Sequence, residues 1–130
     1  MADIIKSWPA AIPAADIADM FTDDAKYSAY YFTIGRGKPK EKIERIWWSY
    51  QGRIIGSFKV DRLVINDGSL PQLGSISGGD MWEIKPDRWV AICESGGELL
   101  NERLFYAGFR GWRYFDIDDY RKCRESKVRL

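Results

Sequence analysis

The stretch IERIWWSYQGRIIGSFKVDRL, residues 43–63, decides the fold of this chain. Apolar and polar side chains alternate on both sides of a Gln-Gly pair, which is the pattern of a β-hairpin. A three-residue turn over residues 50–52, with Gly52 left-handed in a bulge, pairs Trp48 with Ile54. We prefer this turn to a strict two-residue one, because only the longer turn gathers the apolar residues on one face.

This register separates the hairpin into two faces. The apolar face is expected to hold Ile46, Trp48, Ile54, Phe58 and Val60. The opposite face is expected to hold Arg45, Trp47, Ser49, Arg53, Ser57 and Lys59. An indole on such a polar, basic face is available to stack on a ligand, unless Trp47 packs beneath one of the helices expected at the chain ends.

Helices are predicted near both ends of the chain. The segment IPAADIADMF, residues 12–21, places three apolar residues on one helical face and has a proline suited to a first turn. The segment IDDYRKCRES, residues 117–126, follows Asp116, which is a preferred N-cap residue. Acidic residues then open this helix and basic residues close it, as the helix dipole favours.

Further strands are predicted between these helices. They cover KYSAYYFTIG (26–35), RWVAIC (88–93) and a broken strand within 103–115, and a long glycine-rich loop occupies 66–80. The order of helix, strands and helix favours an α+β fold, in which a curved mixed sheet or small barrel of about five or six strands carries flanking helices. A length of 130 residues fits one domain, residues 1–130.

Composition excludes several classes of function. The chain has no histidine, and its two cysteines, Cys93 and Cys123, are isolated, so neither a zinc site nor another metal or cofactor is expected. Both cysteines are expected to be reduced and to act as small core residues. The chain has no apolar run long enough to span a membrane, and its start lacks the features of a signal peptide, so a cytoplasmic protein is expected.

Charge is distributed unevenly along a chain whose net charge is only +1. Residues 36–62 hold eight Lys and Arg against three Asp and Glu, and residues 121–130 hold five against one. Residues 1–24 and 63–120 are acidic instead, with net charges of −4 and −5. The two basic segments either form one basic face or are separate solvated surfaces.

The order of these segments resembles a known superfamily. The stretches YYFTIGRGKPKEKIERIWWSYQGRIIGSFKV (30–60), KPDRWVAI (85–92) and GFRGWRYFD (108–116) resemble the PUA-like pseudo-barrels, and among them ASCH-type domains. The ASCH signature is G-x-K-x-x-E-x-R, and GKPKEKIER (37–45) stands in the same place with Pro39 where the signature has lysine. The resemblance implies a small PUA-like pseudo-β-barrel that binds RNA or another nucleic acid in a cleft beside it, sometimes around a modified base.

Candidate binding residues follow from charge and aromatic content. Guanidinium and ammonium groups grip phosphates, and rings stack on unpaired bases with about 1–3 kcal/mol each. The predicted nucleic-acid-binding residues are Arg36, Lys38, Lys40, Arg45, Trp47, Lys59, Arg110, Trp112 and Arg113. The alternative for Arg110 and Arg113 is pairing with the acidic residues that follow them in sequence.

Three functions remain open on these grounds. The leading one is a small nucleic-acid-binding domain with a basic, aromatic-lined cleft. The second is a metal-independent ribonuclease of ASCH type, for which the candidate catalytic residues are Lys40, Glu41, Glu44 and Arg45. The third is a protein-interaction module whose exposed rings anchor an interface with a protein partner.

Overall fold

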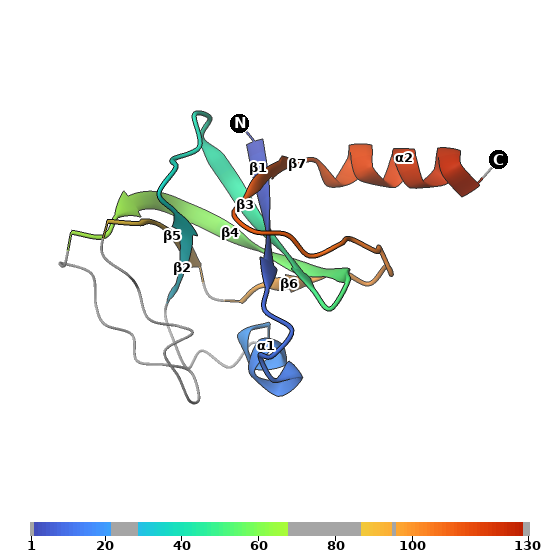
Figure 1. Ribbon diagram of the computed structural model, residues 1–130, viewed down its shortest axis with the longest axis horizontal. Coiled ribbons are helices and arrows are strands. Elements are labelled where there is room, and N and C mark those ends of the chain that lie inside the picture. Colours follow the sequence, from blue (N-terminus) through green and yellow to red (C-terminus); the bar gives the residue numbers. More distant parts are fainter. Residues whose placement is uncertain (1, 22–28, 68–86, 95, 129–130) are drawn as a thin grey trace.

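The computed structural model describes residues 2–21, 29–67, 87–94 and 96–128 (Figure 1). Its helices are α1 (Ala14–Met20) and α2 (Ile117–Val128). Its strands are β1 (Ala2–Trp8), β2 (Ala29–Gly35), β3 (Ile43–Tyr50), β4 (Arg53–Ile65), β5 (Trp89–Glu94), β6 (Glu98–Leu99) and β7 (Arg113–Phe115). Most of the predicted 66–80 loop and residues 26–28 of the first predicted strand lie outside the described residues.

The strands form one mixed sheet in the order β2-β5-β4-β3-β1-β7, with β6 beside β4. Strand β1 runs parallel to β3, and the other pairs are antiparallel. The long strand β4 pairs with β3 through its first half and with β5 through its second half, and the register shifts between Val60 and Arg62. This shift lets the sheet curl into a half-barrel, with α1 at one end and α2 leading away from β7 (Figure 1). The prediction of an α+β fold with a curved mixed sheet is confirmed.

The hairpin turn differs from the predicted one. Gln51 and Gly52 both have positive φ, at 49° and 83°, and Tyr50 stands opposite Arg53, so the loop has two residues. Such a turn matches the twist of its strands. The bulge lies further along, where Trp48 faces Gly56 and the register shifts before the next pair. The predicted three-residue turn and its pairing of Trp48 with Ile54 are therefore wrong. A bulge inside β4 pairs Trp48 with Gly56 instead and still places Trp48 on the same face as Phe58 and Val60.

The bulge decides which residues share a face. Ile46, Trp48, Phe58 and Val60 lie in one buried cluster, as expected. Ile54 lies in the other cluster, with Ile5, Trp47 and Leu104, so its predicted place on the first face is wrong. Residues between the turn and the bulge alternate in the opposite phase, so the predicted face of Arg53 is wrong as well: it lines a hollow with Ile17 and Phe21 of the first cluster.

The first cluster is a set of rings enclosed by the curled sheet. Trp8 of β1 stacks on Trp48 of β3, with ring centroids 4.3 Å apart. Phe58 of β4 contacts Phe21, which follows α1, and Phe32 of β2. Helix α1 adds its buried residues Ile17 and Met20, which confirms the predicted apolar face of this helix.

The second cluster lies on the other face and supports α2. Trp47, Phe115 and Tyr120 pack there, together with Tyr106. Asp116 accepts hydrogen bonds from the backbone N–H groups of Asp118 and Asp119, at 2.9 and 3.0 Å. The predicted N-cap is confirmed, and it fixes the point where β7 turns into α2. Neither helix of the described part is long and apolar enough to cross a lipid bilayer.

Replacing Asp116 by alanine is expected to lower the free energy of unfolding by about 1 kcal/mol, because two backbone donors lose their acceptor. Urea denaturation followed by circular dichroism measures the loss. Asp119→Asn is the matched control, since Asp119 stands in the same helical turn but its carboxylate is not the cap, and its effect should stay below about 0.5 kcal/mol. Equal losses in the two variants would contradict the cap.

Candidate functional site

Three hydrogen bonds hold the basic loop, residues 36–42, against Trp112 and Tyr114 at β7. The Tyr114 hydroxyl accepts the backbone N–H groups of Lys40 and Glu41, at 2.9 and 3.3 Å. The Trp112 indole N–H donates to the Gly37 carbonyl at 3.1 Å. The two rings also meet edge to face, with centroids 5.1 Å apart. Segments about 75 residues apart in sequence thus form one surface.

Cations gather on this surface. The exposed basic residues of the loop are Arg36, Lys38, Lys40 and Lys42. The Lys38 ammonium also lies 4.9 Å from the centroid of the Trp89 ring, which is a cation–π distance. Since Tyr114 is 45% exposed, an open ring stands beside these charges. Of the predicted binding residues, the structure therefore brings together Arg36, Lys38, Lys40 and Trp112.

Arg113 does not join this surface. In β7 it stands opposite Ile5 of β1, on the face away from Trp112 and Tyr114, because successive strand residues point to opposite sides. Its guanidinium lies 4.2 Å from the centroid of the Phe109 ring. Trp112 and Arg113, which are both among the predicted binding residues, therefore do not lie on one surface. Arg110 is exposed in the segment before β7.

Trp47 is buried rather than open. Only 8% of it is exposed, and its indole N–H donates to Asp3 at 2.9 Å. Its ring meets Phe115 at 5.9 Å, under the start of α2. The expectation of a base-stacking ring at this position is wrong, and the alternative of packing beneath the terminal helix is correct. Side chains of the segment before β7, of β7 and of the start of α2 pack against this face of the hairpin.

Arg45 and Lys59 face each other across β3 and β4 on that same face. The Arg45 guanidinium donates to the Ser57 hydroxyl at 3.2 Å and pairs with Glu98 at 3.3 Å. Lys59 is exposed. Of the candidate catalytic residues, Lys40 and Glu41 lie beside Tyr114, whereas the guanidinium of Arg45 is directed to β4 and β6. The four groups of the predicted ribonuclease site are therefore not all assembled around one point.

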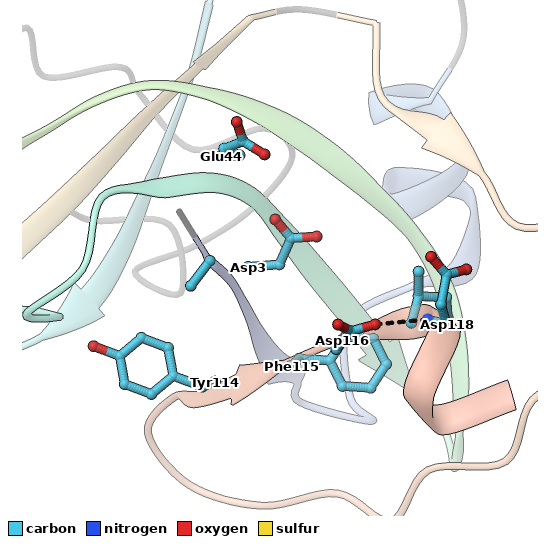
Figure 2. A pocket seen from close by; sticks show the side chains of 8 residues that line it. Asp3, Glu44, Tyr114, Phe115, Asp116 and Asp118 are labelled. Atoms are coloured by element: carbon cyan, nitrogen blue, oxygen red, sulfur yellow. Dashed lines mark hydrogen bonds between the residues drawn. The ribbon is translucent and has the colours of Figure 1, made fainter. Parts of the chain in front are cut away.

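The pocket beside Tyr114 is acidic, which the sequence analysis did not anticipate. It encloses about 480 Å³, and its lining includes Asp3, Glu44, Asp116 and Asp118. Figure 2 shows that these carboxylates come from β1, β3 and the start of α2, with the Tyr114 ring at the edge. The expected basic, aromatic-lined cleft is thus an acidic pocket with a basic loop beside it. Only contacts between distant segments assemble these acids, so a pattern within one segment could not reveal them.

The four carboxylates differ in how far they are already engaged. Asp3 accepts the Trp47 indole, and Asp116 caps α2. Asp118 pairs with Arg121 at 3.4 Å. Within the described ranges, Glu44 has no hydrogen-bond or ion-pair partner, and no group of three or more acidic or cysteine side chains is arranged to hold a metal ion. Glu44 is therefore the acceptor that a ligand in the acidic pocket could use.

A half-buried lysine and a buried cysteine lie away from the pocket. Lys6 donates to the Ile34 carbonyl at 3.2 Å, and burial lowers the pKa of its ammonium. Burial raises the pKa of the Cys93 thiol, so this cysteine is unreactive at neutral pH. Cys123 is exposed on α2, so the expectation that both cysteines are core residues is wrong for this one.

No family model, curated protein or solved structure matches this chain. Function is therefore inferred from the chemistry of the described residues. Three features lie next to one another: a loop with four exposed cations, a pair of rings that fastens it, and a pocket with one unengaged carboxylate. Together they suit a ligand that is anionic along one edge and carries hydrogen-bond donors and a flat apolar surface on another.

Proposed function

We propose that this protein binds single-stranded RNA across the basic loop and the Tyr114 ring, with an unpaired base entering the acidic pocket. The observation that carries the proposal is the fastening of the loop to Trp112 and Tyr114, because it holds cations and an open ring side by side. The proposal includes membership of the PUA-like superfamily, as an ASCH-type domain. The curled sheet is compatible with that fold.

Phosphates would meet the basic loop. Exposed lysine and arginine side chains neutralise phosphates and release counterions, so such binding weakens as salt rises. The Tyr114 hydroxyl holds the backbone of Lys40 and Glu41 in place. The loop therefore loses less conformational entropy when it binds. The cations would keep the strand on the loop side of Tyr114, since the acidic pocket repels phosphates.

A base would occupy the acidic pocket. Its face would lie on the partly exposed Tyr114 ring, and its exocyclic amino group would donate to Glu44. Cytosine, adenine and guanine carry such an amino group, whereas uracil does not. An acidic pocket therefore favours cytosine or adenine over uracil, and a modified base that keeps its amino group fits the same chemistry.

The test is fluorescence anisotropy with labelled oligocytidine, oligoadenine and oligouridine at two salt concentrations. Wild type should prefer the first two. Lys38→Ala/Lys40→Ala should weaken binding and reduce the slope of log affinity against log salt by about 1.4, which corresponds to two lost contacts. Tyr114→Ala should weaken binding roughly fivefold to a hundredfold, as expected for one lost stack.

Two further variants separate the contributions. Tyr114→Phe keeps the ring but loses the loop contacts, so its loss of affinity should be smaller than that of the alanine variant. Glu44→Gln should reduce the preference for cytosine and adenine. Lys122→Ala is the charge-matched control on α2 and should leave the salt slope unchanged. Absence of salt-sensitive binding to all three oligonucleotides would overturn the proposal.

A further inference from the structure

A second hollow of about 510 Å³ is lined by residues of α1, of the turn of the β3–β4 hairpin and of β6. We call it the apolar groove. Its apolar lining consists of Ala14, Ile17, Ala18, Phe21, Ile55 and Leu99. This volume falls within the roughly 300–1,000 Å³ of small-molecule pockets, which are mostly apolar with a few placed polar groups.

The polar groups of the groove are few and mostly engaged. The Tyr50 hydroxyl donates to the Ile12 carbonyl and accepts from the Gln51 amide at 3.0 Å. Arg53 is the one charged residue among those described as lining the groove. Among the described residues none forms an ion pair with it, and its side chain is exposed. The groove therefore offers an apolar wall and a single uncompensated cation.

Two large apolar side chains at and near the rim of the groove are exposed. Leu99 is 58% exposed on β6, and Phe105, which stands opposite Arg53 in an isolated bridge, is 61% exposed. These are two of the four large apolar residues that the described part of the chain exposes. Both lie along one edge of β4, with Leu99 opposite Gly56 and Phe105 opposite Arg53. Apolar side chains close to one arginine suit a ligand that is apolar along most of its length and anionic at one end.

We infer that the apolar groove binds a small amphipathic monoanion, namely a hydrophobic carboxylic acid whose carboxylate pairs with Arg53. The apolar body would lie against Ile17, Phe21 and Ile55, and Leu99 would cover it at the rim. A guanidinium binds a carboxylate through two parallel hydrogen bonds, which fixes the orientation of the ligand. The inference is independent of RNA binding, because the groove and the basic loop share no residue.

Isothermal titration calorimetry with octanoate, decanoate and decyltrimethylammonium, each below its micelle concentration, and with decanol below its solubility limit tests the inference. Decanoate should bind at a single saturable site and about fourfold more tightly per CH₂ than octanoate, since each added CH₂ buries apolar surface. Decanol should bind about tenfold more weakly than decanoate, because it lacks the charge-assisted hydrogen bonds. Equal affinity for decanoate and decyltrimethylammonium would overturn the inference.

Arg53→Gln should reduce decanoate affinity about tenfold and leave decanol affinity unchanged. Arg62→Gln is the matched control, because Arg62 is an exposed arginine on the same strand that pairs with Asp61 and does not line the groove. Leu99→Ser should weaken both ligands and, since Leu99 is exposed, leave the fold intact. Light scattering tests whether a second copy of the chain occupies the groove instead. A dimer that Leu99→Ser dissociates, together with an absence of decanoate binding, would assign the groove to a second copy and overturn the inference.

Discussion

Replacing Phe58 by alanine is expected to lower the free energy of unfolding by about 3–5 kcal/mol. Phe58 is fully buried, and its ring meets those of Phe21, Tyr30 and Phe32 at centroid distances of 4.8, 5.5 and 5.0 Å. These neighbours come from the end of α1 and from β2, so the ring of Phe58 joins β4 to a helix that the sheet alone does not hold. A cavity at this point removes contacts from all of them, and it can close only if the half-barrel changes shape.

Urea denaturation followed by tryptophan fluorescence measures this loss. Phe58→Leu should cost less than the alanine variant, since it leaves a smaller cavity. Lys59→Ala, the exposed neighbour on the same strand, should change stability by less than about 0.5 kcal/mol. Because small domains are stable by about 5–15 kcal/mol, the alanine variant should be largely unfolded at modest urea concentrations. A loss below about 1 kcal/mol would mean that the aromatic cluster is not the core of this fold.

The hairpin could be predicted from sequence because its signal is local. Alternation with period two placed Ile46, Trp48, Phe58 and Val60 on one face, and the structure agrees. The pattern did not locate the bulge, because a bulge inserts one residue without any change in composition. Ile54, next to the turn, was therefore assigned to the wrong face.

Strand β1 had no such signal. Ile4 and Ile5 are neighbours in sequence and both fully buried, because β3 and β7 flank the strand and both of its faces are covered. This arrangement removes the alternation that marks a half-buried strand. The burial of Trp47 beneath α2 was considered only as an alternative, because the sequence did not indicate that β1 and β7 extend the sheet beside the hairpin.

The candidate site was likewise predicted only in part. Its residue types were predicted, since the cations of the basic loop and the rings of GFRGWRYFD stand out in the sequence. Which ring meets which charge depends on the pairing of β7 with β1 and on the alternation within β7. That alternation places Tyr114 with the loop and Arg113 away from it. The acidic pocket needs contacts among three segments, so no single stretch of sequence could indicate it.

Replacing Gly56 by alanine is expected to cost roughly 3 kcal/mol, the upper end for overpacking. A Cβ at Gly56 would lie 2.3 Å from the Glu98 carbonyl oxygen and 2.8 Å from a carbon of the Phe21 ring. The carbonyl belongs to β6, which pairs with β4 at this residue, so it cannot withdraw without breaking the pair. The ring is held in the aromatic cluster, so neither neighbour can give way cheaply.

Gly108→Ala is the matched control, because a Cβ there meets nothing within 4 Å and the glycine does not have a positive φ. It should leave stability unchanged or raise it by up to about 1 kcal/mol, through a less flexible unfolded chain. Thermal and urea denaturation of the two variants measure the difference. A side chain at Gly97 would also clash, since its Cβ would lie 2.6 Å from the Phe58 ring. Two glycines thus let β6 approach the core closely enough for Leu99 to reach the rim of the apolar groove, and an unchanged stability of Gly56→Ala would mean that β6 does not lie there.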